Sequence, residues 1–173
     1  MLEGGNSAEA EVSRSSAAQI TKALDAQGYE TKLIDIGQNQ LTDDIVVFKP
    51  DVIFPALHGP VGEDGTIQGF LEVLGIPYVG SGVRGSALAM DKNVSKKIFD
   101  SLEIPSARGV LVEELPSSMN SLHQHIKEQL GERVVIKPIN QGSALGVEIV
   151  SDLSDLKTRL ARSCLLYTSD AAD

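Results

Sequence analysis

The chain has 173 residues, of which 42% are hydrophobic and 23% are charged, and its 24 acidic against 15 basic residues give a formal net charge of −9. With this acidity and only 4% aromatic residues, a nucleic-acid partner is not expected, because the chain lacks the makings of a phosphate-binding groove or a base-stacking platform. The sequence has no apolar run long enough to span a membrane, no zinc pattern, and a single Cys164 that cannot form an internal disulfide, so we expect a soluble cytoplasmic protein.

In the first half of the chain, helical and strand patterns alternate, which is typical of a three-layer α/β domain with a parallel sheet. The expected elements are helix 7–27, strand 30–36, a short helix near 41–48, strand 51–57, helix 66–74 and an extended piece at 77–79. Because only Met1 to Glu3 precede the first glycine turn, we expect most of an opening strand to be missing and its place in the sheet to be empty.

The glycine turn at Gly4-Gly5 leads into the first predicted helix. Asn6 and Glu9 have the spacing of a capping box. The predicted apolar stripe of this helix, before Gly28 ends it, consists of Val12, Ile20, Ala23 and Leu24. From the residues alone, Glu9 is as readily a helix cap as a ligand.

His58 follows the apolar run 51–57, which is typical of a strand buried on both faces of a parallel sheet. A glycine-rich loop comes next, and Asp64 is the expected N-cap of the helix that begins at Thr66. A helix start and an imidazole at the carboxyl end of a strand can together bind a small anion. A simple capped turn explains the same residues.

The second half begins with a helical region from Gly80 to about Ser101, whose lysines fit a solvated basic face. Strand 108–112, helix 119–130, strands 133–137 and 146–150, and a helix from Asp152 to Arg162 are expected to follow. A small-residue loop joins the last two strands: Lys137 precedes it, and Gly142, Ser143 and Gly146 would let backbone amides approach phosphate oxygens. A plain hairpin connection is the alternative.

The predicted domain boundary lies near Gly85. We expect an α/β domain over 1–85, a second domain over 86–162, and a non-native tail over 163–173 that does not fit the preceding helical spacing. The apolar side chains Leu153, Leu156 and Leu160 would then lack cover.

Four stretches together resemble one family. The run HGPVGEDGTIQG from His58, the opening GG-x-S-x-E-x-x-VS pattern that contains Glu9, the Met-Asp-Lys at Lys92, and the loop from Lys137 to Gly146 are similar to the D-alanine–D-alanine ligases of the ATP-grasp class. The resemblance implies a pre-ATP-grasp domain with a parallel sheet, followed by a truncated α+β ATP-grasp domain. It also implies an enzyme that joins two D-alanines through an acyl phosphate, for peptidoglycan precursor synthesis.

The resemblance implies a role for each matching residue. Glu9 would hold the ammonium of the first D-alanine and His58 its carboxylate, while Ser143 would orient Glu9. ATP would be bound by Lys92, Lys137, Gly142, Ser143 and Gly146. Ala144 departs from a second serine that family members often carry. The ligands of Mg²⁺ would lie beyond the end of this sequence, so we expect the 173 residues alone not to catalyse ligation.

Two alternatives remain open. A D-alanine–D-lactate ligase or another ATP-grasp carboxylate–amine ligase would share every motif seen here. A non-catalytic nucleotide-binding α/β module would keep the phosphate loop without needing Glu9 and His58 together. Family members commonly form homodimers through the N-terminal domain, which makes a homodimer a further expectation.

Overall fold

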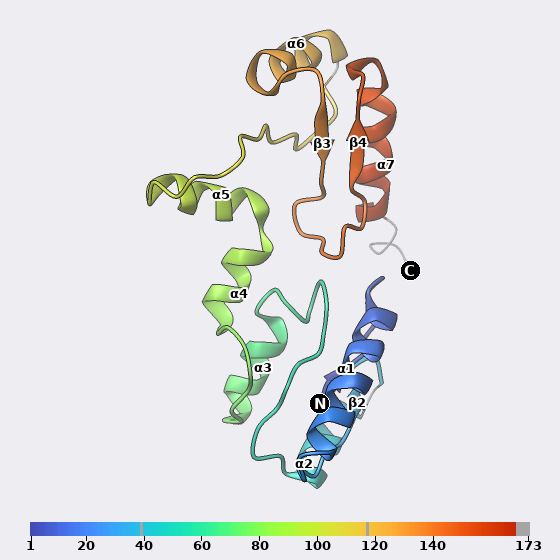
Figure 1. Ribbon diagram of the computed structural model, residues 1–173, viewed down its shortest axis with the longest axis vertical. Coiled ribbons are helices and arrows are strands. Elements are labelled where there is room, and N and C mark those ends of the chain that lie inside the picture. Colours follow the sequence, from blue (N-terminus) through green and yellow to red (C-terminus); the bar gives the residue numbers. More distant parts are fainter. Residues whose placement is uncertain (39, 117, 169–173) are drawn as a thin grey trace. The chain divides into compact units, whose positions relative to one another are not determined.

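Residues 1–38, 40–116 and 118–168 are described by a computed structural model (Figure 1). The chain divides into two units, Met1–Met90 and Asp91–Asp173. The predicted boundary near Gly85 therefore falls inside helix α4 (Val83–Met90), which belongs whole to the first unit. The helical region predicted from Gly80 to Ser101 is two helices, because Asp91 is extended and caps α5 (Lys92–Ser101) through hydrogen bonds from Asn93 N and Val94 N.

Short parallel segments form the sheet of the first unit. Strand β1 (Leu2–Glu3) pairs with β2 (Ile34–Asp35) on one side and bridges from Leu2 to Pro55 on the other, and Ile53 bridges to Tyr78. Leu2 N donates to Phe54 O at 3.0 Å, and Ala56 N donates to Leu2 O at 2.9 Å. Met1 to Glu3 thus fill the central place in the sheet, and the expectation of an empty position is wrong.

The lateral order of these segments places a topological switch point beside β1. The chain moves from β1 outward to β2, then returns to the other side of β1 at residues 53–55 and continues outward to Tyr78. In open parallel sheets, ligands bind outside the carboxyl ends of the strands at such a point. At this point, β1 leads into the glycine turn before Glu9, and the segment 53–55 beside it leads into His58.

Two helices that were predicted with their observed bounds cover this sheet, α2 (Leu41–Phe48) and α3 (Thr66–Leu74). They contribute to one apolar core, whose buried members are Leu2, Ile34, Ile45, Ile53, Leu57, Ile67 and Leu71. The predicted strands are shorter in the structure: β2 covers two residues of 30–36, and 51–57 forms only isolated bridges. The α/β class with a parallel sheet is confirmed.

Helix α1 (Ala10–Asp25) begins three residues later than predicted and differs in its cap and its buried face. Glu9 occupies the N-cap position and makes no capping hydrogen bond through its side chain, so the capping box with Asn6 is wrong. The buried positions are Ser13 and Ala17, while Val12 is 48% exposed and Ala23 is also exposed. The predicted stripe fails because a serine, and not the nearby valine, faces the strands.

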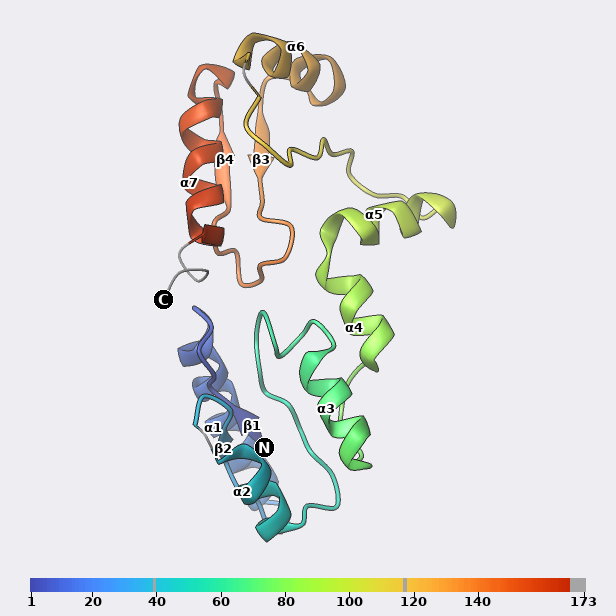
Figure 2. The same ribbon diagram turned by 180° about the vertical axis from the view of Figure 1, so that it is seen from behind.

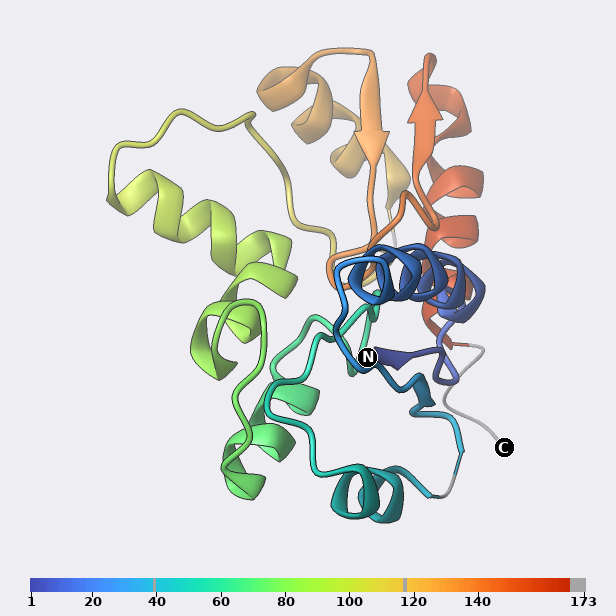
Figure 3. The same cartoon turned by 60° about the horizontal axis from the view of Figure 1, so that its bottom comes forward.

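The second unit is built around a hairpin with a helix along it. Strand β3 (Val134–Ile136) pairs antiparallel with β4 (Glu148–Val150), and the two arrows run in opposite directions in Figure 3. Helix α7 (Leu156–Thr168) follows a short 3-10 turn, η1 (Leu153–Asp155), and lies along β4 in both Figure 1 and Figure 2. Helix α6 (Met119–Leu130) completes the core, in which Ile126, Val150, Leu156 and Leu160 are buried.

Three expectations for this unit need correction. Residues 108–112 form no strand, although Val110 and Val112 pack against the core. Leu156 and Leu160 are buried, and Leu153 packs against them, so the expected uncovered apolar face is wrong. Helix α7 continues past Arg162 to Thr168, and the last five residues of the predicted tail lie outside the described residues.

Within the described part of the chain, none of the helices combines the length and the apolar character that a membrane span requires.

Candidate functional site

One buried hydroxyl connects the glycine turn after β1 to the neighbouring strand segment. Ser13 Oγ accepts a hydrogen bond from Gly4 N at 2.8 Å and donates one to Ala56 O at 2.7 Å. The side chain is fully buried, so both bonds are formed away from water and their loss would leave two unpaired backbone groups. Ser13 therefore fixes the turn that carries Glu9 against the segment that ends in His58.

Asp35, at the end of β2, holds the same turn from the other side. Its carboxylate accepts hydrogen bonds from Gly5 N at 3.0 Å and Gly37 N at 2.8 Å, and it forms an ion pair with Arg14 at 2.9 Å. Burial works to raise the pKa of Asp35, but the two backbone hydrogen bonds and the guanidinium outweigh it and hold that pKa below its ordinary value. The carboxylate of Asp35 thus anchors the glycine turn to the end of β2.

Glu9 is buried without a partner. Its side chain is only 1% exposed, and neither carboxyl oxygen has a hydrogen-bond partner among the described residues. Gly59 lies directly beside it, because a Cβ built on Gly59 would collide with Glu9 Oε2. An unpaired polar group in such a place costs free energy that a bound hydrogen-bond donor would recover. Glu9 is therefore no cap of α1, and it suits a cationic or N–H donor ligand.

His58 lies next to this acid, at the carboxyl end of the segment that bridges to β1. The Ser7 hydroxyl donates to His58 O at 3.3 Å and accepts from Glu9 N at 3.3 Å, so one side chain joins both stretches. The imidazole Nε2 is 3.3 Å from Ser16 Oγ on α1. The first unit thus brings together two of the predicted site residues, Glu9 and His58.

The loop after His58 is fixed by its own acids and by a buried amide. Glu63 Oε2 accepts from Gly59 N at 2.7 Å, and Gln68 Nε2 donates to Gly62 O at 2.8 Å. Asp64 accepts from Val61 N at 2.8 Å and from Thr66 N at 2.9 Å. Although burial opposes it, this hydrogen bonding lowers the pKa of Asp64. The N-cap of α3 is Gly65 and not Asp64, which corrects the prediction by one residue.

The predicted nucleotide-binding residues lie in the second unit. Lys92 Nζ donates to Ile139 O at 3.2 Å and to Gln141 O at 2.5 Å, and Lys92 N donates to Ile139 O at 3.3 Å. The first turn of α5 is therefore joined to the β3–β4 loop. Lys137 is exposed at the start of that loop. The structure brings Lys92 to the loop carbonyls and leaves Lys137 facing solvent.

The β3–β4 loop carries a run of left-handed backbone conformations. The φ angles are 45° at Ser143, 59° at Ala144 and 66° at Gly146. Within the described part of the chain, the amides of these three residues and of Gly142 donate to no acceptor, whereas Leu145 N donates to Gly142 O at 2.9 Å. Successive unpaired amides of this kind form concave anion-binding surfaces. Ser143 is exposed on this loop, in the second unit, while Glu9 and His58 belong to the first.

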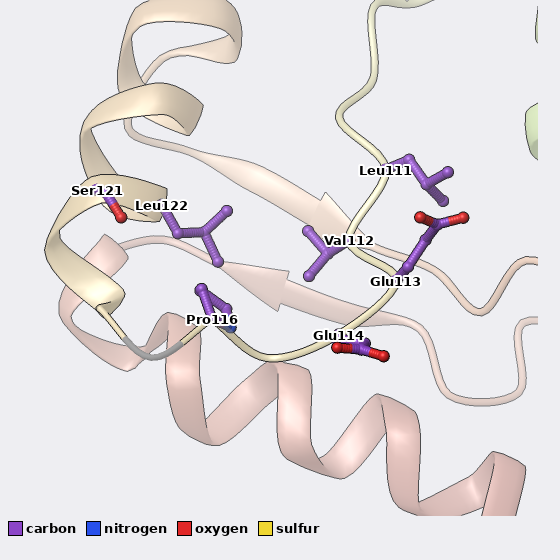
Figure 4. A pocket seen from close by; sticks show the side chains of 7 residues that line it. All are labelled: Leu111, Val112, Glu113, Glu114, Pro116, Ser121 and Leu122. Atoms are coloured by element: carbon purple, nitrogen blue, oxygen red, sulfur yellow. The ribbon is translucent and has the colours of Figure 1, made fainter.

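The pocket shown in Figure 4 lies elsewhere in the second unit. Val112, Glu114 and Pro116 line it from the extended segment before α6, and Leu122 lines it from α6. It contains none of the predicted site residues. Among the described residues, no group of three or more His, Cys, Asp or Glu side chains could hold a metal ion. The described residues thus offer no three-ligand cluster for the Mg²⁺ that the resemblance implies.

Three residues that position the site were given no role from the sequence: Ser13, which ends the opening pattern, Ser16 and Asp35. Ser13 and Ser16 stand four and seven residues after Glu9, on the face of α1 that turns toward the strands. That spacing is a usable signal, since polar residues on a buried helical face need partners. Asp35 carries a weaker local signal, because only its partner Gly37 is near in the sequence, whereas Gly5 and Arg14 are distant.

Comparisons with known proteins agree with this geometry. The family described as "D-ala D-ala ligase N-terminus" matches residues 38–81. The chain is 45% identical over 152 residues to D-alanine–D-alanine ligase B of Mesorhizobium japonicum, covering 88% of this chain and 47% of that protein. It is 44% identical to the D-alanine–D-alanine ligase of Granulibacter bethesdensis, covering 94% of this chain and 51% of that protein. The chain thus spans about half the length of these curated relatives.

Solved structures give the same result. The D-alanine–D-alanine ligase of Coxiella burnetii superposes with a TM-score of 0.77 at 27% identity, over 95% of this chain and 59% of that one. The Bacillus anthracis enzyme complexed with ATP superposes with a TM-score of 0.74 at 35% identity, over 92% of this chain and 52% of that one. The fold is therefore that of the corresponding part of an ATP-grasp ligase. Within that class, the chain belongs to the D-alanine–D-alanine ligase family.

Proposed function

We propose that this chain acts in the ATP-dependent ligation of two D-alanines, with its first unit holding the first D-alanine and its second unit holding the phosphates of ATP. The observation that carries the proposal is Glu9, a buried carboxyl without a partner beside His58. The dipeptide would serve peptidoglycan precursor synthesis in the cytoplasm. The names of the relatives and the ATP complex of one of them support the same substrates.

The chemistry of the first unit suits a small zwitterion. Glu9 would accept hydrogen bonds from an ammonium group, and the imidazole of His58 would donate one to a carboxylate. A bound ammonium would also remove the cost of leaving Glu9 unpaired. Because Gly59 leaves no room for a side chain next to Glu9, the substrate would lie against backbone at this point. Holding both ends of the amino acid fixes the direction of the carboxylate that reacts.

The chemistry of the second unit suits phosphate oxygens. The unpaired amides of Gly142, Ser143 and Gly146 would donate to the phosphates, and Lys137 would add a positive charge at the start of the same loop. Lys92 would act on the loop through the carbonyls that it already binds. ATP supplies the phosphoryl group that activates the first carboxylate, and Mg²⁺, when bound, neutralises phosphate charge.

Binding to the chain itself tests the proposal. Backbone amide NMR spectra of the uniformly ¹⁵N-labelled chain are recorded during titration with D-alanine, with D-lactate and, separately, with ATP. We expect D-alanine to shift the amides around Glu9 and Gly59, and ATP to shift those from Gly142 to Gly146. D-lactate lacks the ammonium and should bind at least tenfold more weakly, because a charge-assisted hydrogen bond is worth about 1.5–3 kcal/mol.

The control variant is Glu9→Gln, which keeps the shape of the side chain and removes its acid. It should lose the D-alanine shifts and keep the ATP shifts, because Gly142 and Ser143 belong to the other unit. A chain that binds ATP but shows no response to D-alanine would instead be a nucleotide-binding module, and the ligase proposal would be abandoned.

A further inference from the structure

The imidazole of His58 has a partner that its proposed role leaves unexplained. Ser16 lies in the second turn of α1, and its Oγ is 3.3 Å from His58 Nε2. Both side chains are half-buried. Among the described residues, this is the one hydrogen bond found for the Ser16 hydroxyl and for the imidazole ring.

The two ends of His58 are thereby held by the same segment of chain. Ser7, in the turn before α1, donates to the backbone carbonyl of His58 at 3.3 Å, while Ser16 contacts the ring. Main chain and side chain are both fixed, so the ring has a set orientation relative to Glu9. A hydrogen bond to one ring nitrogen also decides which nitrogen carries the proton of the neutral imidazole.

Two arrangements of the shared hydrogen are chemically possible. If Nε2–H donated to Ser16 Oγ, the hydroxyl proton would have no acceptor among the described residues, and Nδ1 would be a bare acceptor. If the hydroxyl donates to Nε2, its proton is used and Nδ1 carries the ring proton. Nδ1 has no partner among the described residues and, unlike the oxygens of Glu9, is not cut off from solvent. The second arrangement leaves a free N–H donor at the site.

We propose that Ser16 is a positioning residue for His58: its hydroxyl donates to Nε2, which keeps the ring proton on Nδ1 and presents Nδ1–H to the carboxylate of a bound amino acid. The identity of that carboxylate rests on the proposed function, whereas the position of the proton does not. A carboxylate requires a donor, so the opposite tautomer would turn a lone pair toward it. Ser16 would thus set the affinity for substrate without touching it.

The ring nitrogens can be observed directly. The chain has three histidines, and the other two, His123 and His125, belong to the second unit and serve as internal references. Two-bond ¹H–¹⁵N spectra of the imidazoles are recorded at a pH high enough that the ring signals no longer move, and His58 is assigned with a His58→Gln variant. We expect protonated Nδ1 and bare Nε2 in the unaltered chain.

Three variants complete the test. Ser16→Ala should move the His58 proton toward Nε2, the tautomer that unrestrained histidine favours, and Ser16→Thr should restore the original pattern because it keeps the hydroxyl. Ser15→Ala, at the exposed neighbouring position of the same helix, should leave it unchanged. If the competent tautomer falls from nearly all of the population to about a fifth, the dissociation constant for D-alanine rises about fivefold.

The outcomes separate this inference from the proposed function. Bare Nδ1 in the unaltered chain, or a spectrum that Ser16→Ala does not change, overturns the role of Ser16 whatever D-alanine does. If the ring pattern is as expected but D-alanine does not bind the unaltered chain, the proposed function fails while the positioning of His58 by Ser16 holds. Backbone amide spectra of each variant confirm that it is folded before its ring signals are compared.

Discussion

Replacing Gly59 by alanine separates the effect of Glu9 on binding from ordinary backbone strain. Gly59 has a φ of +71°, and a Cβ there would collide with Glu9 Oε2. Gly75, at the end of α3, has nearly the same φ of +69°, but a Cβ there would meet nothing within 4 Å. Both substitutions place a side chain in the left-handed region, which costs roughly 1–2 kcal/mol. Only Gly59→Ala should also displace the Glu9 carboxyl.

The size of the binding effect follows from the bond that is lost. In the proposed function, a displaced Glu9 would no longer accept from the ammonium of D-alanine, and a charge-assisted hydrogen bond contributes about 1.5–3 kcal/mol. Gly59→Ala should therefore raise the dissociation constant for D-alanine roughly ten- to a hundredfold, while Gly75→Ala leaves it within about twofold. Urea unfolding followed by far-ultraviolet circular dichroism measures the strain, and NMR titration measures the affinity.

Unchanged affinity in both alanine variants would refute the reasoning, because displacing the Glu9 carboxyl would then have no effect on binding. The Gly75→Ala control distinguishes loss of the Glu9 contact from backbone strain. If Gly75→Ala lost as much affinity as Gly59→Ala, the loss would come from general strain in the first unit and not from the contact with Glu9.

Three further predictions concern the supports of the site. Ser13→Ala should lower the free energy of unfolding by about 2–4 kcal/mol in urea titrations, because it leaves two buried backbone groups unpaired, whereas Ser15→Ala should change it by less than about 0.5 kcal/mol. Burial raises the pKa of Asp35, but its hydrogen bonds prevail and lower it, so the stability that Asp35 adds is present above its ordinary pKa of 3.8 and is lost as the pH falls below that value. Asp35→Asn should flatten this acid-side decline in thermal melts recorded from pH 5 downward, and an unchanged slope would contradict the assignment. Lys92→Met should speed hydrogen exchange about tenfold at the bonded loop amides of Leu145 and Val147, because it removes the Lys92 bonds to two loop carbonyls. Lys97→Met, at an exposed position of the same helix, should not change this exchange.

The helices were predictable where a local pattern decides them. Helices α2, α3 and α6 have the bounds that their apolar spacing and flanking residues indicate, because these signals act within a few residues. Strands were less predictable, since a ladder depends on a partner far along the chain. Residues 108–112 have strand-like composition but no partner among the described residues, whereas Leu2–Glu3 is short and becomes the centre of a sheet.

In the candidate site too, local features were predictable and contacts between distant residues were not. The run from His58 and the acid at Glu9 are recognisable in the sequence, but their proximity depends on a parallel sheet that sets their strands side by side. The choice between cap and ligand for Glu9 could not be made from spacing, because an acid before a helix satisfies either reading. In the structure the carboxyl makes no capping bond and stays unpaired, which excludes the cap and motivates the proposed ligand role. The contacts of Lys92 with loop carbonyls could not be predicted from local sequence either, because the partners Ile139 and Gln141 are far along the chain.

The unpaired carboxyl of Glu9 has a thermodynamic consequence for how ligands of this chain can be found. A ligand that binds only the folded state raises stability by RT ln(1 + [L]/Kd), about 2.7 kcal/mol at a hundredfold excess over Kd. Small amines that bind Glu9 would therefore raise the melting temperature. The Glu9→Gln variant would abolish this increase for such amines and keep it for ligands that bind elsewhere. A melting screen of amino acids and their analogues could thus rank the preferences of the first unit without any turnover.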